Sequence, residues 1–167
     1  RQTPSVIIGS RQNIQFTARP VDTVMEQAQE ALRAGAYVML ESGKGVENVD
    51  CVIIATGSEV PLAVQARARL EEMGYGTRVV SMPCVELFDK LSKEDQDKLL
   101  TNAPKIAIEA SVTGLWYKYV KDGAVIGIDT FGESAPAGVL WEKFGFTIDR
   151  VVEAAKNLIQ RSFFIEE

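Results

Sequence analysis

Short runs of apolar residues alternate with longer amphipathic segments along most of the chain. The apolar runs are typical of strands buried on both faces of a sheet, and they cover residues 5–9, 37–41, 51–56, 77–82, 105–110 and 124–129. Segments with a helical spacing of apolar residues lie between them, at residues 21–34, 58–73, 92–100, 114–120, 136–144 and from 147 onward. This alternation predicts a three-layer α/β/α fold with a mostly parallel, five- or six-stranded sheet.

The runs at residues 37–41 and 51–56 are expected to differ from the other strands. A turn that contains Gly43 and Gly45 separates them. We therefore expect the two runs to pair as a hairpin, which gives the sheet one antiparallel edge strand.

Helix ends and buried helix faces are also predicted. We expect Gly35 to end the first helix, and N-cap side chains at Asp22 or Thr23, Ser58, Ser92 and Thr147. The expected apolar faces are Val24, Ala28, Ala31 and Leu32 in the first helix, Val60, Ala63, Ala66, Leu70 and Met73 in the second, and Val151, Val152, Ala155 and Leu158 in the last.

Composition is that of a globular protein, with 167 residues, 46% of them hydrophobic and 25% charged. This length predicts a single domain over residues 1–167. The net charge of -5 is spread along the chain, which argues against nucleic acid or anionic lipid as a partner. No run of apolar residues is long enough to span a membrane, and we expect a cytoplasmic location. Because the first residue is Arg1 rather than Met, we expect a piece of a longer protein.

The residue types restrict the chemistry of the chain. It has no histidine, which excludes a Ser-His-Asp or Cys-His catalytic group and a His metal ligand. Cys51 and Cys84 lie in separate apolar segments, where small core side chains are expected. We therefore predict no catalytic residue, no cofactor-binding residue and no metal ligand in this chain.

Two segments lie where ligands bind in open α/β sheets, beyond the carboxyl ends of strands. Arg11 follows the strand expected at residues 5–9, and its planar guanidinium suits a phosphate or a carboxylate, although a structural ion pair fits this position too. The turn at residues 56–60 leads from a strand into a helix, a geometry that suits an anion. Glu59 in that turn would repel a phosphate, so a structural role is favoured there.

Two further motifs have simple structural interpretations. Glu133 and Ser134 precede the helix expected at residues 136–144 and are interpreted as turn and cap residues. Trp116, Tyr117 and Tyr119 form an aromatic cluster, for which core packing and contact with another domain or subunit both remain open.

Taken together, five motifs in order resemble the C-terminal domain of transketolases, of the bacterial, yeast and plant type. The resemblance covers essentially the whole chain, and the motifs are Ser10-Arg11-Gln12-Asn13, Thr56-Gly57-Ser58-Glu59-Val60, Arg78-Val79-Val80-Ser81-Met82-Pro83, Trp116-Tyr117-Lys118-Tyr119 and Phe131-Gly132-Glu133-Ser134-Ala135-Pro136.

The resemblance implies a transferase that moves a two-carbon ketol unit from a ketose phosphate to an aldose phosphate. Such enzymes are homodimers of the pentose phosphate pathway that use thiamine diphosphate with Mg or Ca, held by their N-terminal and middle domains. The Gly-Asp-Gly motif of those domains and the family's histidines are absent here, so we expect the isolated domain to be inactive. Its expected partners are a sugar phosphate, the N-terminal and middle domains, and a second subunit.

One functional residue carries over by resemblance. The arginine of the Ser-Arg-Gln-Asn motif binds the terminal phosphate of the substrate in this family, and Arg11 matches it. Two alternatives remain: a stand-alone regulatory α/β module that binds an anion, and the same domain of dihydroxyacetone synthase. The β-part of a thiamine-dependent dehydrogenase fits less well, because its substrates carry no sugar phosphate.

Overall fold

The computed structural model describes residue 6, residues 13–14, residue 17 and residues 21–163. Its helices and strands follow one another in the order α1 (Val21–Ala34), β1 (Tyr37–Leu40), β2 (Cys51–Ala55), η1 (Gly57–Glu59), α2 (Val60–Glu72), β3 (Thr77–Ser81), α3 (Val85–Phe88), α4 (Lys93–Leu100), β4 (Lys105–Ile108), η2 (Thr113–Leu115), α5 (Tyr117–Val120), β5 (Ala124–Ile126), α6 (Ala137–Phe144) and α7 (Ile148–Phe163). The strand expected at residues 5–9 lies outside the described residues except for Val6, which is in no strand and is 82% exposed.

The five strands of the described residues form one sheet in the order β1-β3-β2-β4-β5. β2, β3, β4 and β5 are parallel, and β1 is antiparallel to β3 at the edge. The predicted mostly parallel sheet with one antiparallel edge strand is therefore confirmed. The predicted hairpin is wrong, because β3 lies between β1 and β2. The connection at residues 41–50, which joins β1 to β2, therefore passes across the end of β3.

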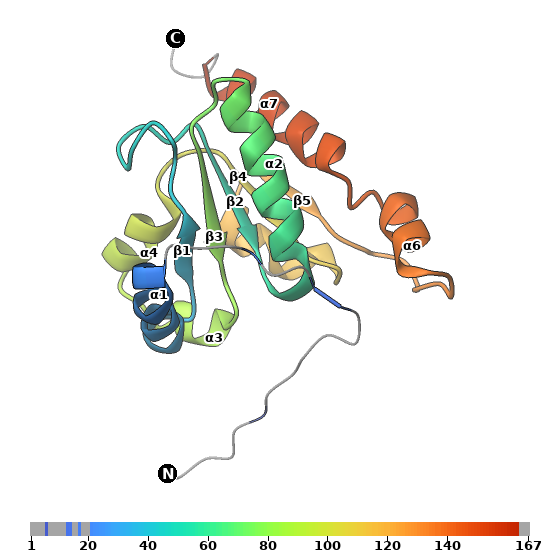
Figure 1. Cartoon of the computed structure of the whole chain (residues 1–167), viewed down its shortest axis with the longest axis horizontal. Coiled ribbons are helices and arrows are strands. Elements are labelled where there is room, and N and C mark those ends of the chain that lie inside the picture. The colour runs from blue at the N-terminus through green and yellow to red at the C-terminus, as the bar shows by residue number, and fades with distance from the viewer. Residues whose placement is uncertain (1–5, 7–12, 15–16, 18–20, 164–167) are drawn as a thin grey trace.

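Helices cover both faces of the sheet, as Figure 1 shows. α2 and α7 pack on one face, against Ile53, Val79 and Ile106. α3, α4 and α5 pack on the other, against Val52, Ile54 and Val80. Successive strand residues point to opposite faces, which is why continuous apolar runs are required in a sheet that is covered on both sides.

A buried ion pair fixes the edge strand. Arg78 of β3 has a side chain only 5% exposed, and its guanidinium donates to both carboxylate oxygens of Glu41, at 2.7 and 2.9 Å. The same guanidinium donates to the backbone carbonyls of Lys98 and Leu99 at the end of α4. Arg78 thus connects β1, β3 and α4, and a bidentate contact of this kind favours the pairing of β1 with β3.

Helix α1 has the predicted bounds and ends at Gly35, but its apolar face is not the buried one. Leu32 is 80% exposed, whereas Gln27 faces the edge strand and donates to the carbonyls of Val38 and Met39 at 3.0 and 3.2 Å. The carbonyls of an edge strand need donors, and Gln27 supplies them, so the helix turns its Val24 and Leu32 side away from the sheet.

The predicted caps agree with the structure at two helices. Ser92 accepts from the backbone N–H of Asp95, and Thr147 accepts from that of Arg150, so both serve as predicted. The expected cap at α1 is wrong, because the helix begins at Val21, before Asp22 and Thr23. Ser58 is no cap either; it lies in η1, and its hydroxyl donates to Glu59.

The buried helix faces agree with the prediction except at a few positions. In α2, Ala63, Ala66 and Leu70 are buried as expected, but Met73 lies past the end of the helix and is exposed. All four predicted inward residues of α7 are buried. The short helix α3 was not predicted, although its Phe88 belongs to the core.

Candidate functional site

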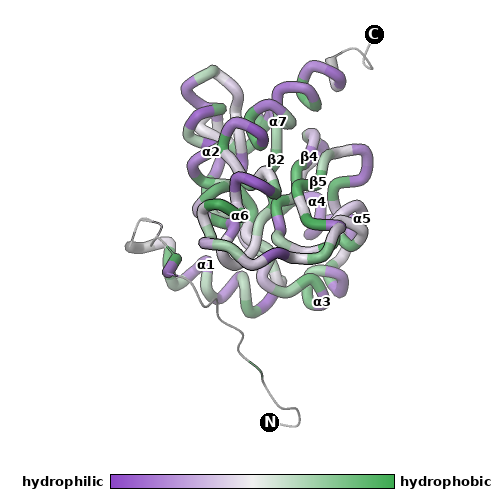
Figure 2. The backbone as a smooth tube through the Cα atoms, turned by 90° about the vertical axis from the view of Figure 1, so that its right-hand side faces the viewer, coloured by the Kyte–Doolittle hydropathy of each residue, from purple (hydrophilic) through white to green (hydrophobic). Residues whose placement is uncertain are grey.

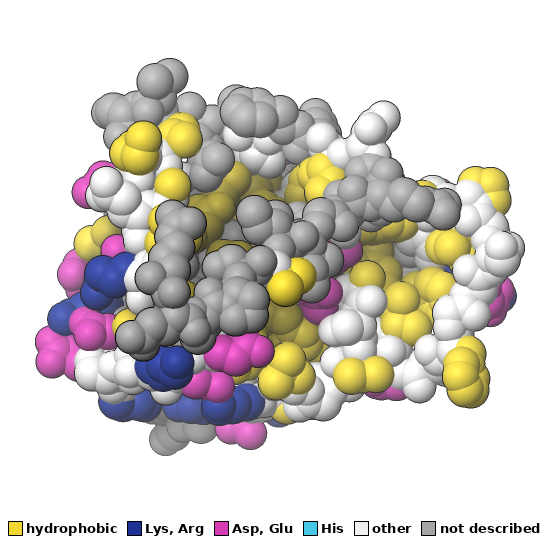
Figure 3. All heavy atoms as spheres, turned by 90° about the horizontal axis from the view of Figure 1, so that it is seen from below, with side chains coloured by type: hydrophobic (Ala, Val, Ile, Leu, Met, Phe, Trp, Pro, Cys, Tyr) yellow, Lys and Arg dark blue, Asp and Glu magenta, His cyan; other side chains and the backbone are white. Residues whose placement is uncertain are grey.

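The sheet has a topological switch point at the carboxyl ends of β2 and β4. These two strands are neighbours with Ala55 opposite Ile108, but the helix after β2 covers one face of the sheet and the helix after β4 covers the other. In open α/β sheets, ligands bind in the crevice that this divergence leaves. Figure 3 views the molecule from the side of these strand ends.

A cavity of about 510 Å³ lies beside this switch point. We call it the carboxyl-end cavity; it is lined by Asn13, Ile14, Ser58, Pro61, Leu62, Gln65, Ala137, Gly138, Trp141, Glu142, Phe146, Thr147 and Ile148. Three of the sequence motifs thus supply or adjoin its wall: Asn13 ends the Ser-Arg-Gln-Asn motif, Ser58 belongs to the turn after β2, and Ala137 follows the Phe-Gly-Glu-Ser-Ala-Pro motif. Arg11, the one predicted site residue, lies outside the described residues.

Behind Ser58 lies a buried carboxyl group. Glu59 is only 3% exposed, and its Oε1 accepts from the Ser58 hydroxyl at 2.7 Å. Burial raises the pKa of Glu59, and the hydrogen bond from Ser58 opposes that rise. This turn therefore carries its own acidic group, which favours the structural interpretation of residues 56–60 over the anion-binding one.

Glu109 follows β4 and faces Glu59. Burial, the charge of Glu59 and a hydrogen bond between the two side chains raise the pKa of Glu109 from 4.5 to about 7. Its Oε2 is buried and accepts no hydrogen bond from the described residues. The nearby Asp129 is already occupied, since it accepts from the backbone N–H and the hydroxyl of Thr113 at 2.8 Å each.

The raised pKa of Glu109 favours a protonated carboxyl group beside Glu59, a state in which the two groups can share one proton. Two carboxylates in contact repel each other, and burial makes the charged forms still less favourable. Sequence reasoning found Glu59 but missed Glu109, because the two are distant in the chain and meet only through the pairing of β2 with β4.

The motif at residues 131–136 does not cap α6. The N-cap position is Pro136, without a side-chain hydrogen bond, and Glu133 instead pairs with Lys143 at 2.6 Å. The expected cap role of Glu133 or Ser134 is therefore wrong.

The aromatic cluster is divided between core and surface. Trp116 and Tyr119 are buried, with ring centroids 5.9 Å apart, and the Tyr119 hydroxyl donates to Asp89. Tyr117 is half exposed. Core packing therefore accounts for two of the three rings.

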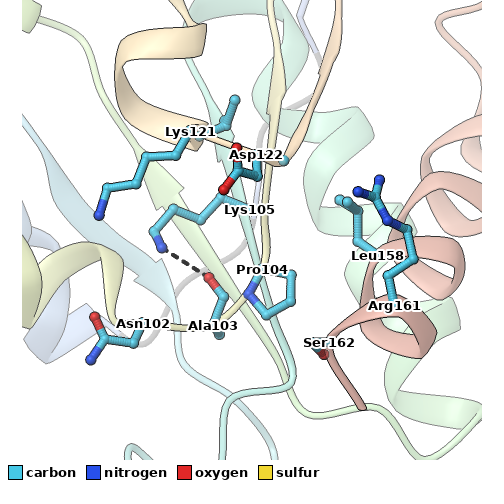
Figure 4. Close-up of a pocket in the computed structure, with 11 residues that line it drawn as sticks. Asn102, Ala103, Pro104, Lys105, Lys121, Asp122, Leu158, Arg161 and Ser162 are labelled. Atoms are coloured by element: carbon cyan, nitrogen blue, oxygen red, sulfur yellow. Dashed lines mark hydrogen bonds between the residues drawn. The ribbon is translucent and has the colours of Figure 1, made fainter. Parts of the chain in front are cut away.

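A second cavity, of about 220 Å³, lies at the opposite end of the sheet near Lys105, Lys121 and Arg161. Figure 4 shows the two lysine ammonium groups on one side of Pro104 and the guanidinium of Arg161 on the other. Lys105 donates to the carbonyl of Ala103 at 2.9 Å, and Lys121 stands at the C-terminal end of α5, where a positive charge is favourable. Because these cations do not converge on one point, the carboxyl-end cavity remains the candidate site.

Two other features are absent from the part of the chain that the structure describes. Within residues 21–163 and the few described residues before them, no three His, Cys, Asp or Glu side chains are placed to hold a metal ion. Over the same part of the chain, no helix has the length and apolar character needed to cross a membrane.

Known proteins resemble this chain in both sequence and structure. A family model described as "Transketolase-like TK C-terminal domain" matches residues 35–147. Transketolase 2 of Vibrio parahaemolyticus is 43% identical over 163 residues, which are 95% of this chain and 23% of the relative. The chain thus spans about a quarter of the length of the curated relatives it matches.

Two solved structures extend this likeness to the fold. Transketolase from Leishmania mexicana superposes with a TM-score of 0.72 at 41% identity, covering 79% of this chain and 19% of that one. Transketolase of Pichia stipitis, in complex with sedoheptulose-7-phosphate, superposes with a TM-score of 0.71 at 33% identity. The match covers 86% of this chain and 20% of the Pichia stipitis chain.

Proposed function

The chain belongs to the transketolase family, and on that basis we propose that it is the C-terminal domain of a full-length transketolase. That enzyme transfers a two-carbon ketol unit from a ketose phosphate to an aldose phosphate. The observation that carries the proposal is the 43% identity to a bacterial transketolase over 95% of this chain. The domain adds no catalytic residue of its own and supplies substrate and domain contacts.

Thiamine diphosphate and a Mg or Ca ion supply the chemistry of the full-length enzyme when they are bound. We assign their binding to the N-terminal and middle domains, which precede this one and contact it.

Arg11 is proposed to bind the terminal phosphate of the substrate. Two residues after it in the sequence, Asn13 lines the carboxyl-end cavity beside the switch point, where ligands bind in open α/β sheets. A guanidinium can hold a phosphate with two parallel hydrogen bonds, remote from the reacting carbons, and so orient the substrate. The carboxyl pair of Glu59 and Glu109 would repel a phosphate from the turn after β2.

An assay of the full-length protein tests the proposal. Purified protein with thiamine diphosphate and Mg²⁺ should convert a ketose phosphate and an aldose phosphate into a ketose phosphate two carbons longer than the acceptor. Residues 1–167 alone should give no turnover under the same conditions. Absence of transfer by a folded, cofactor-loaded full-length protein would overturn the assignment.

A further inference from the structure

A continuous segment between β5 and the middle of α6 lies on the surface. Every residue of Asp129–Val139 is exposed, and α6 has no buried residue at all. We call Asp129–Val139 the surface arm. Figure 1 shows α6 and the segment before it at the margin of the molecule, and in Figure 2, which looks at that side, α6 faces the viewer.

Contacts at its start, in its middle and just beyond its end hold the surface arm. At its start, the carboxylate of Asp129 accepts from the backbone N–H and the hydroxyl of Thr113. In its middle, Glu133 pairs with Lys143 of α6, and beyond its end Trp141 packs edge-to-face on Phe146 with ring centroids 5.3 Å apart. An arm fixed in this way can bind a partner with little loss of conformational entropy.

Two of its exposed side chains are large and apolar. Phe131 is 96% exposed and Val139 is 55% exposed. In Figure 3, hydrophobic side chains spread over the α6 side of the face, whereas Lys, Arg, Asp and Glu gather on the other side. An exposed aromatic side chain in an apolar, ordered patch is typical of a protein contact.

The chain path indicates which partner this is. Asn13 and Ile14 line the same cavity as Ala137 and Gly138, so the polypeptide enters the domain beside α6. This chain covers only 23% of its relative, and the matching family model is that of the C-terminal domain. Most of a full-length chain therefore precedes Asn13 and is joined to the domain next to the surface arm.

We propose that the surface arm docks on the domain that immediately precedes it in the same full-length chain, with Phe131 in an apolar site of that domain. The proposal rests on the proposed function, because it requires the preceding domains. A second copy of the chain is the competing occupant, and the experiment separates the two.

Photo-crosslinking of the full-length protein tests this docking. The photoreactive residue p-benzoylphenylalanine replaces Phe131 in one variant and Val139 in a second, so that misfolding of either leaves one probe. Val46, which is 57% exposed in the connection before β2 at the opposite end of the sheet, is the matched control position. Equal amounts of ¹⁵N-labelled and unlabelled protein are incubated until subunit exchange between any dimers is complete, the mixture is irradiated, and crosslinked peptides are identified by mass spectrometry.

Docking within one chain predicts crosslinks from position 131 or 139 to the preceding domain, with both peptides carrying the same isotope. The yield should exceed that from position 46 at least tenfold. Crosslinked peptides of mixed isotope would assign the arm to a second copy and overturn the proposal, as would a yield equal to that of the control. Ketol-transfer activity of the same samples is measured separately, so an inactive protein with the expected crosslinks refutes the proposed function and not the docking.

Discussion

The carboxyl groups of Glu59 and Glu109 meet where β2 and β4 end side by side, and burial and the charge of Glu59 raise the pKa of Glu109. Glu59 is almost fully buried, and no donor among the described residues reaches Oε2 of Glu109. Burial and the neighbouring charge therefore both favour the protonated form of Glu109, in which the two groups can share one proton.

This pair should make stability depend on pH. A carboxyl group whose pKa is higher in the folded state stabilises that state most at low pH, and the contribution is lost as pH rises through the folded-state pKa. Since the pKa of Glu109 rises from 4.5 to about 7, the loss should fall between about pH 5 and pH 8. We expect Glu109→Gln to gain on the order of 1–3 kcal/mol of unfolding free energy relative to wild type over this interval, measured by urea denaturation.

Glu153→Gln is the matched control, because Glu153 is an exposed glutamate on α7. Its stability difference from wild type should stay constant across the same pH interval. A constant difference for Glu109→Gln as well would show that the two carboxyl groups do not share a proton.

The Arg78–Glu41 pair should contribute strongly to stability. Arg78→Met removes the partner of Glu41 and leaves the carbonyls of Lys98 and Leu99 without their donor. Loss of one member of a buried pair costs about 3–5 kcal/mol, and we expect about 3 kcal/mol because the Glu41 side chain is 33% exposed and can be hydrated.

Arg69→Met provides the comparison at an exposed pair. Arg69 and Asp149 have side chains 52% and 83% exposed, so this variant should lose less than about 1 kcal/mol. Equal losses for the two variants in thermal unfolding would contradict the role assigned to Arg78.

Two glycines with positive φ should differ sharply in their tolerance of alanine. Gly35 has φ +72°, and an added Cβ would lie 2.1 Å from the carbonyl oxygen of Cys84. Gly74 has φ +87° but open space around its Cα. Gly74→Ala should cost about 1–2 kcal/mol from backbone strain alone.

Gly35→Ala should cost at least about 2 kcal/mol more, because α1 must also move away from the turn after β3. Chemical denaturation of both variants measures the difference. Similar losses would mean that the contact between Gly35 and Cys84 is not tight in solution.

Much of the fold could be predicted from the sequence, because its strands are buried on both faces. The run Cys51–Ala55 is apolar at every position, which fixes its class and approximate bounds, and the apolar centre Val79-Val80 marks the strand Thr77–Ser81. The partner of β1 could not be predicted, because it depends on the contact of Arg78 with Glu41, which are far apart in the chain. The exposed face of α1 was mispredicted because Gln27, a polar residue, makes the contact with the edge strand.

The candidate site was less accessible to sequence reasoning. Glu59 was recognised in its turn, but its partner Glu109 becomes visible only when β2 and β4 are known to be neighbours. The exposure of Phe131 depends on where the chain runs after β5, and no local pattern records that path. Arg11 was singled out by its position after a predicted strand, and its phosphate role came from the resemblance alone.

Arg11 is proposed to bind the phosphate of the substrate in the full-length enzyme. Arg11→Ala should raise KM for phosphorylated acceptors at least tenfold, with a smaller effect on unphosphorylated ones, since only the former make the charge-assisted contact. Arg11→Lys should restore binding only in part, because the bidentate guanidinium is lost. Arg33→Ala, at an exposed pair with Glu30 on α1, is the control and should leave both KM values unchanged.

The most direct measurement is therefore the ratio of KM for a phosphorylated aldose to KM for its unphosphorylated counterpart, determined for wild type and Arg11→Ala. We predict that this ratio rises at least tenfold in the variant. An unchanged ratio, with both KM values altered equally or not at all, would contradict the role of Arg11 and with it the proposed contribution of this domain to substrate binding.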